Sequence, residues 1–216
     1  MGLIFSLCRK SEVETSSEVI PFYIPLLKRP MFIIGITGKA GSGKDTLADH
    51  IVKNYGFEKK SFAGPLKKGV SELFSIPIET LNDTVAKEQE NPVWNQSPRK
   101  LMQWLGTDIL RKYIRDDFFI ASLANDLNNS TSHRIVISDV RFDKEAEYLK
   151  YLGVPIIRIE TGIRKTIATM GKKEAKHSSE NGISERLIDY TIINDTTIND
   201  LKYTFDNVIA ENLKIL

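Results

Sequence analysis

The sequence predicts an α/β fold in which helices cover both faces of a mainly parallel β-sheet. Short apolar runs of strand length alternate along the chain with amphipathic stretches of helix length, which is typical of this class. The runs at 32–36 and 135–137 carry no polar residue, as expected of strands in a sheet with both faces covered. A chain of 216 residues, of which 41% are hydrophobic, is long enough for one well-packed domain.

Local signals place the elements in order from residue 31 onward. Strands are expected at 32–37, 59–62, 134–139, 154–160 and 190–194. Helices are expected at 44–54, from about 65, at 97–113, 117–127, 143–151 and 198–213. Ser97 and Pro98 have the residue types of a helix N-cap and first helical position. Residues 161–185 are rich in Gly, Lys, Ser and Glu, so we expect a loop or lid there.

Residues 1–30 differ from the rest because no helix or strand period runs through them. We therefore expect an N-terminal extension over 1–30 and one domain over 31–216. The first six residues fit the pattern for N-myristoylation on Gly2, and Cys8 beside two basic residues offers a second, reversible anchor. One acyl chain binds membranes only marginally, so the second anchor matters, and the expected result is a weak membrane association through the N-terminus. A chance match, or a natural start at Met31, is the alternative.

Composition argues against several classes of protein. Thirty basic and 28 acidic residues give a formal charge of +2, which does not favour a dedicated binder of nucleic acid or of a membrane surface. The single cysteine excludes an intrachain disulfide and a multi-cysteine metal site, and agrees with a reducing compartment. No apolar run approaches the ~18 residues of a membrane span. We therefore expect a cytoplasmic protein.

A phosphate-binding loop is expected directly after the first strand. Gly38, Gly43 and Lys44 have the Walker A spacing and stand between a strand and a helix. Glycines let backbone N–H groups approach phosphate oxygens, and the helix N-terminus favours negative charge. The lysine then lies against the β and γ phosphates of a nucleoside triphosphate. The sequence thus predicts a P-loop NTPase-type sheet with an ATP site at Gly41, Ser42, Gly43, Lys44, Asp45 and Thr46.

The residue after the P-loop lysine is Asp45, where Ser or Thr is usual. Polyphosphate repels a nearby carboxylate unless a divalent cation lies between them. We therefore expect Asp45 to hold Mg²⁺, directly or through its waters, with Thr46 as the other candidate ligand. A simple helix-start role for Asp45, favourable to the helix dipole, is the alternative.

A second polar group is expected at the carboxyl end of the strand at 134–139. Asp139 and Arg141 are two residues apart, so both can point beyond the strand end, where open α/β sheets bind ligands. A carboxylate paired with a guanidinium suits a sugar hydroxyl beside a phosphate. Lys67, near the start of a predicted helix, is a further candidate for anion binding, with an ordinary surface lysine as the alternative.

The helix predicted at 97–113 carries a third group. Arg99, Gln103 and Gly106 fall on one stripe with Leu110, and Thr107 lies at its edge. Arg99 suits bidentate phosphate binding, and Gln103 suits the hydrogen-bonding edge of a base. A glycine inside a helix indicates close approach by another group. A solvated helix face with a tight helix contact at Gly106 is the alternative.

Several segments in this order resemble the deoxynucleoside monophosphate kinases of tailed bacteriophages and large DNA viruses. They are Gly-Ser-Gly-Lys-Asp-Thr (41–46), Ala-Gly-Pro-Leu-Lys (63–67), Arg-Lys-Leu-Met-Gln-Trp-Leu-Gly-Thr-Asp (99–108), Asp-Val-Arg-Phe-Asp-Lys-Glu (139–145) and Ile-Ile-Asn-Asp (192–195). The resemblance implies a nucleoside-monophosphate-kinase-like fold with a lid over 161–185. It also implies ATP-dependent phosphorylation of deoxynucleoside monophosphates, for viral DNA precursor synthesis, with small nucleotides as the binding partners, no direct contact with nucleic acid, and a homodimer.

The resemblance also implies residue roles. Lys44, Arg99, Asp139 and Arg141 are expected to serve catalysis. The monophosphate site is expected to include Lys67, Arg99, Gly106, Thr107, Phe119, Asp139, Arg141 and Glu145, together with Gln103 from the helix stripe. Phe119 is the expected stacking surface for the base. Ala40 stands where some relatives have a basic residue, and the lid matches poorly.

Two other readings of the residues stay open at this point. A small-molecule kinase resembling phosphomevalonate kinase shares the Gly-Lys-Asp phosphate loop but does not need Phe119 as a stacking platform. A nucleotide-sensing interaction protein, brought to membranes by an acylated N-terminus, would bind ATP with little transfer.

Overall fold

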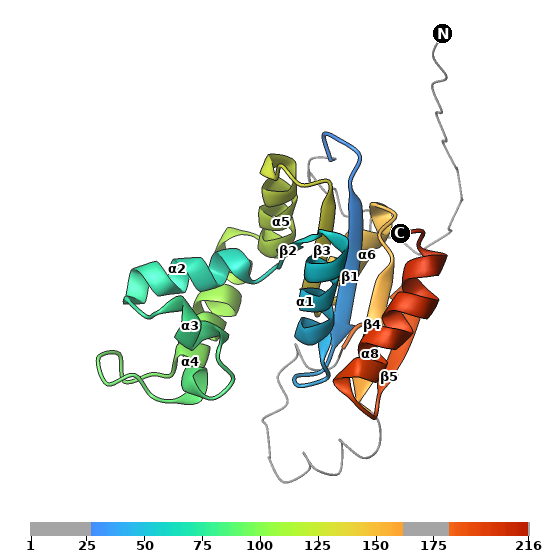
Figure 1. The fold of residues 1–216 in the computed structure, drawn as a ribbon. Coiled ribbons are helices and arrows are strands. Elements are labelled where there is room, and N and C mark those ends of the chain that lie inside the picture. The colour runs from blue at the N-terminus through green and yellow to red at the C-terminus, as the bar shows by residue number, and fades with distance from the viewer. Residues whose placement is uncertain (1–26, 162–181, 216) are drawn as a thin grey trace.

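Five parallel strands form the sheet at the centre of the fold (Figure 1). The computed structural model describes residues 27–161 and 182–215. The strands are β1 (Phe32–Gly38), β2 (Glu58–Lys60), β3 (Arg134–Val140), β4 (Ile156–Thr161) and β5 (Tyr190–Asn194). They lie in the order β2-β3-β1-β4-β5, and every neighbouring pair is parallel. The predicted α/β fold with a parallel sheet is confirmed.

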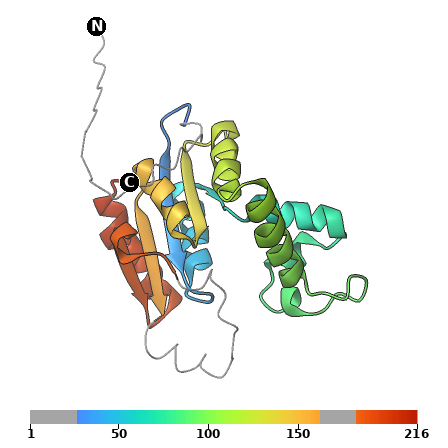
Figure 2. The same cartoon turned by 180° about the vertical axis from the view of Figure 1, so that it is seen from behind.

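Helices cover both faces of this sheet. One face packs on α1 (Lys44–Tyr55) and on α8 (Ile198–Thr204), which continues as a π-helical segment, η5 (Phe205–Ala210). The other face packs on α5 (Phe118–Asn129) and α6 (Asp143–Tyr151), as seen from behind in Figure 2. Successive residues of a strand point to opposite faces, so Ile33 joins the core under α5 and α6, whereas Ile34 joins the core under α1 and α8.

A helical arm, residues 64–114, lies beside the sheet (Figure 1). It consists of α2 (Gly64–Phe74), α3 (Ile78–Asn82), the 3₁₀ turn η1 (Ala86–Glu88), α4 (Pro98–Gln103) and the π-helical segment η2 (Trp104–Ile114). The arm has a small core of its own, made by Val70, Ile76, Leu81 and Leu101. The short elements α3 and η1 were not expected from the sequence.

The π-helix in the arm changes which residues share a face. Residues 98–114 are helical as predicted, but η2 is π-helical, and i→i+5 hydrogen bonding widens each turn. A period of 3.6 residues therefore assigns faces wrongly beyond Gln103. Leu110, expected on one stripe with Arg99, packs instead against the core cluster beneath α5 and α6.

The expected N-terminal extension and lid lie largely outside the described residues. Residues 1–26, and with them Gly2 and Cys8, are outside, as are residues 162–181 of the predicted lid at 161–185. The division at residue 30, the lid, the homodimer and the cytoplasmic location remain predictions. In the described part of the chain, every helix is too short or too polar to cross a membrane.

Candidate active site

The phosphate loop joins the carboxyl end of β1 to the first turn of α1. Gly41 and Gly43 have φ angles of 75° and 100°, a backbone region that favours glycine. A Cβ atom added at Gly43 would lie 2.6 Å from Asn194 Nδ2, so the neighbouring protein leaves no space there. A Cβ atom at Gly41 would have no described atom within 4 Å. The loop therefore packs on the protein at Gly43 and is open at Gly41, as binding of a phosphate requires.

The last strand fixes the phosphate loop. Asn194, buried at the end of β5, donates a hydrogen bond from Nδ2 to the Ser42 carbonyl oxygen at 2.8 Å. Leu201 of α8 lies close to Gly43 on the same side. Sequence analysis did not give Asn194 a role, although a polar residue that ends a strand at this edge is a usable signal.

We expect Gly43→Ala to destabilise the protein by about 2–3 kcal/mol, because strained backbone of this kind alone costs about 1–3 kcal/mol and the new Cβ displaces Asn194. Gly69→Ala is the matched control, since Gly69 lies in α2 with no described atom within 4 Å of an added Cβ. That variant should be more stable by roughly 0.5–1 kcal/mol. Urea unfolding measures both. Equal stabilities of the two variants would contradict the expected packing at Gly43.

Lys44, the first residue of α1, is nearly buried. Its side chain is 11% exposed, and its Nζ lies 3.6 Å from Asp45 Oδ2. Burial lowers the pKa of Lys44, and the positive charge of Arg141 lowers it further. The negative charge of Asp45 opposes both effects without cancelling them. An anion bound beside Lys44 would stabilise its charged form. The place of Lys44 at the start of α1 suits a phosphate ligand, and that role remains a prediction.

Asp45 lies between two lysines. Its Oδ1 accepts a hydrogen bond from Ser138 Oγ at 3.3 Å and lies 3.4 Å from Lys59 Nζ. Partial burial raises the pKa of Asp45, but the charges of Lys44 and Lys59 outweigh this effect, so the pKa lies below its ordinary value. The carboxylate is ionised at neutral pH and its side chain is 63% exposed. An accessible carboxylate at this place suits the expected metal ligand. Lys59 was missed by sequence analysis.

Asp139, at the end of β3, binds the chain that leads into the arm. Its Oδ1 accepts a hydrogen bond from the backbone N–H of Phe62 at 2.8 Å, and its Oδ2 accepts one from Ala63 at 2.9 Å. Burial raises the pKa of Asp139, whereas these hydrogen bonds and the charges of Arg141 and Lys67 oppose the rise. The carboxylate therefore fixes the start of α2, the helix that carries Lys67.

Lys67 and Arg99 have partners inside the arm. Lys67 Nζ donates a hydrogen bond to Asn82 Oδ1 at 2.8 Å, and Arg99 Nη1 donates one to Glu88 Oε1 at 2.7 Å. Burial lowers the pKa of Lys67, opposed by the charges of Asp139 and Asp45. Lys67 therefore lies within electrostatic reach of the phosphate-loop residues, and Arg99 is ion-paired to η1.

Glu145 holds the backbone that follows β3. Its Oε2 accepts hydrogen bonds from the backbone N–H groups of Arg141 at 3.0 Å and Phe142 at 3.2 Å. Its Oε1 accepts a hydrogen bond from Arg111 Nη2 at 3.0 Å. Glu145 is only 3% exposed, whereas Arg141 is exposed at the sheet edge. Glu145 therefore positions Arg141.

Comparison with known proteins identifies the family. The family model for deoxynucleotide monophosphate kinase matches residues 72–205. A protein of Acanthamoeba polyphaga mimivirus, described as a putative deoxynucleotide monophosphate kinase, is 37% identical over 185 residues, which span 79% of this chain and 92% of the relative. The chain belongs to the deoxynucleotide monophosphate kinase family. It is a phosphotransferase, as the motifs predicted.

Two further proteins resemble this kinase more distantly. A deoxynucleoside-5'-monophosphate kinase of Escherichia phage T5 is 23% identical over 248 residues, covering 84% of this chain and 98% of the relative. The structure of dephospho-CoA kinase from Campylobacter jejuni aligns with a TM-score of 0.42 and 16% identity, over 83% of this chain and 96% of that chain. An alignment at that level does not bear on the function of the kinase.

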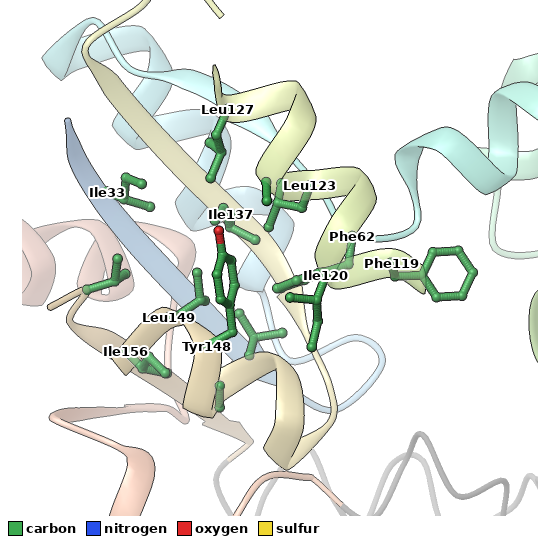
Figure 3. Packing of buried hydrophobic residues seen from close by; sticks show 14 of the residues in the cluster. Ile33, Phe62, Phe119, Ile120, Leu123, Leu127, Ile137, Tyr148, Leu149 and Ile156 are labelled. Carbon is green, nitrogen blue, oxygen red and sulfur yellow. The ribbon is translucent and has the colours of Figure 1, made fainter. Parts of the chain in front are cut away.

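Gly106 and Phe119 lie close together where the arm meets α5 in this kinase. A Cβ atom at Gly106 would lie 2.9 Å from Leu66 Cδ2 and 3.5 Å from Phe119 Cζ. The tight packing considered as the alternative at Gly106 is therefore present. Phe119 is 5% exposed, and in Figure 3 its ring points away from the other labelled side chains of the core. Gln103 is half-buried and Thr107 is exposed on the same arm.

The predicted residues of the kinase form two groups. One group lies at the carboxyl edge of the sheet, where the charges of neighbouring members shift the pKa values of Lys44, Asp45, Lys67 and Asp139, and Arg141 acts on three of these four. Arg99, Gln103, Gly106 and Thr107 lie on the arm. Arg111, which contacts both Glu145 and Phe119, was missed because its spacing does not distinguish it from Lys112 or Arg115.

Proposed function

We propose that the kinase transfers the γ-phosphoryl group of ATP to deoxynucleoside monophosphates, giving deoxynucleoside diphosphates and ADP. One observation carries the proposal. The positive charge of Arg141 lowers the pKa of both Lys44 and Lys67, so both lysines lie within its electrostatic reach, at the end of the sheet where the phosphate loop meets the arm. Such a cluster suits two polyphosphate groups that must be brought together against their repulsion. The names of the mimivirus and phage relatives support the class of acceptor.

The donor side of the proposal is the phosphate loop. Residues 41–46 bind the polyphosphate of ATP, with backbone N–H groups and the buried Lys44 as its ligands. Asp45 and Thr46 would hold Mg²⁺, which prefers a few oxygen ligands and keeps part of its water shell. The exposed, ionised carboxylate of Asp45 fits that role. When bound, the ion supplies positive charge that offsets charge developing on the transferred group.

The acceptor side lies between the sheet edge and the arm. Lys67, Arg99 and Arg141 bind the monophosphate, while Gln103, Thr107 and Phe119 contact the nucleoside beside Gly106. A nucleoside monophosphate has a second pKa of about 6, so its attacking oxygen is largely deprotonated at neutral pH. No general base is needed, and Asp139 orients the acceptor side through its bonds to the start of α2.

The test is release of ADP from ATP, measured across a panel of deoxynucleoside monophosphates, ribonucleoside monophosphates and phosphomevalonate. We expect turnover with at least one deoxynucleoside monophosphate, and product analysis should show the matching diphosphate. ATP without an acceptor is the control, and it should be hydrolysed far more slowly. Turnover with phosphomevalonate alone would contradict the proposal, as would ATP binding without transfer to any acceptor.

A further inference from the structure

Arg111 lies where the arm meets the sheet, and neither the motifs nor the proposed function gives it a role. Its guanidinium carbon lies 4.9 Å from the centroid of the Phe119 ring and 4.4 Å from that of the Phe142 ring. Both distances are typical of cation–π contacts. The side chain is 19% exposed and donates a hydrogen bond to Glu145. One residue of η2 therefore contacts the start of α5 and the start of α6.

Glu145 links Arg111 to Arg141, because it accepts hydrogen bonds from both residues. The two oxygens of its carboxylate have different partners: Oε1 accepts from Arg111, and Oε2 accepts from the backbone N–H groups of Arg141 and Phe142. A buried carboxylate that loses its cationic partner is strongly destabilised in its ionised form. The state of Glu145, and so the position of the backbone at Arg141, depends on Arg111.

We propose that Arg111 is a positioning residue for the acceptor: it holds Glu145 and thereby orients Arg141, and it sets the arm against Phe119. The inference rests on the proposed function, because Arg141 and Phe119 are the groups expected to meet the acceptor. Arg111 links the two halves of the acceptor site, since η2 belongs to the arm and Glu145 to the sheet edge.

This arrangement gives a specific pH dependence. The groups that face Glu145 are Arg111 from η2, Asp139 from β3, and the backbone N–H groups of Arg141 and Phe142. Burial raises the pKa of Glu145 to about 7; the Asp139 charge adds to the rise, while Arg111 and the N–H groups oppose it. Loss of the Arg111 charge therefore moves this pKa further upward. A protonated carboxyl is a weaker acceptor for backbone N–H groups, so activity should need a higher pH.

The experiment compares Arg111→Met, Arg111→Lys and the wild-type kinase in steady-state transfer from ATP to a deoxynucleoside monophosphate between pH 6 and 9. We expect kcat/KM for the acceptor of Arg111→Met to fall about 10–100-fold at pH 7, as misplacement of a binding group does. The KM for ATP should stay within about twofold, because the phosphate loop is untouched. The rising limb of the pH profile should move upward by roughly 1–3 units, and Arg111→Lys should restore part of the loss.

Arg115→Met is the matched control. Arg115 follows the same helix and pairs with Asp117, so the substitution removes the same charge without touching Glu145. Its acceptor kcat/KM and pH profile should equal those of the wild type. An Arg111→Met enzyme with a wild-type acceptor kcat/KM and an unmoved pH profile would overturn the proposal. A rise in the KM for ATP as large as the fall in acceptor kcat/KM would overturn it as well.

Glu145→Gln keeps the inference testable if Arg111→Met fails to fold. This variant has the same shape without the titrating carboxyl, so the rising limb near pH 7 should disappear from its profile and leave only the rise at about pH 6 from the acceptor phosphate. A limb near pH 7 that persists would overturn the proposal. A wild-type enzyme without activity on any monophosphate refutes the proposed function instead, and is thus distinguishable from failure of the Arg111 inference.

Discussion

Lys44→Met is expected to reduce the rate of phosphoryl transfer by about 10²–10³-fold, the loss typical of removing one preorganised charge from a transition state. Lys44 is nearly buried at the start of α1, and burial lowers its pKa. In the absence of a ligand, desolvation therefore destabilises the charged form of Lys44, and a bound phosphate offsets this effect. Methionine fills a similar volume without that cost, so the variant should unfold at or above the wild-type temperature. Single-turnover transfer of labelled phosphate at saturating ATP measures the chemical step.

Lys53→Met is the control for this prediction, because Lys53 is exposed in the last turn of the same helix. Its transfer rate and its unfolding temperature should match those of the wild type. A Lys44→Met enzyme that keeps more than about a tenth of the wild-type rate would show that Lys44 does not act on the transferred group.

Arg141→Met is expected to lower kcat/KM for the acceptor by about 10³-fold, the lower range seen when an arginine that stabilises phosphoryl transfer is removed. Arg141 is exposed at the end of β3 while its backbone is held by Glu145, so the fold should tolerate the change. ATP binding, measured by equilibrium titration, should change little. Arg141→Lys should recover only part of the loss, since an ammonium lacks the planar fork that binds phosphate oxygens bidentately.

Arg186→Met provides the comparison for Arg141. Arg186 is exposed and pairs with Glu147 on α6, and it is assigned to neither nucleotide site. Its acceptor kinetics should stay at the wild-type value. Near-normal turnover by the Arg141→Met enzyme would show that Arg141 does not bind the acceptor. It would also refute the inference that Arg111 acts on the acceptor through Glu145 and Arg141.

Elements governed by local pattern were predicted well. The bounds of β5 (Tyr190–Asn194) and of α6 (Asp143–Tyr151) agree with the sequence prediction residue by residue. A short strand such as β5 is marked by its run of apolar and β-branched residues, and an amphipathic helix such as α6 by its period. The π-helical η2 was not predictable in this way, because the wider turns depend on packing against α2 and α5. The short α3, five residues long, has too little sequence to show a period.

For the candidate site too, features set by local sequence could be predicted, whereas contacts between distant residues could not. The phosphate loop is readable because its glycines and lysine act through the local backbone, so their spacing is itself the signal. The residues that hold the site in place could not be predicted from the sequence. Asn194 reaches Ser42 across 152 positions of sequence, and Arg111 reaches Glu145 across 34. Only the folded chain brings such pairs together, and a single sequence carries no spacing that marks them.

The hydrogen bond from Asn194 to Ser42 has a consequence for the order of events during biosynthesis. The ribosome makes the phosphate loop early and the strand that holds it late, since 152 positions separate the two residues. A nascent chain that has not yet released residues 190–205 lacks both Asn194 and the α8 contact at Gly43. Nucleotide therefore has no preformed site on the growing chain until residues 190–205 have left the ribosome, and it can act as a folding ligand only after that point.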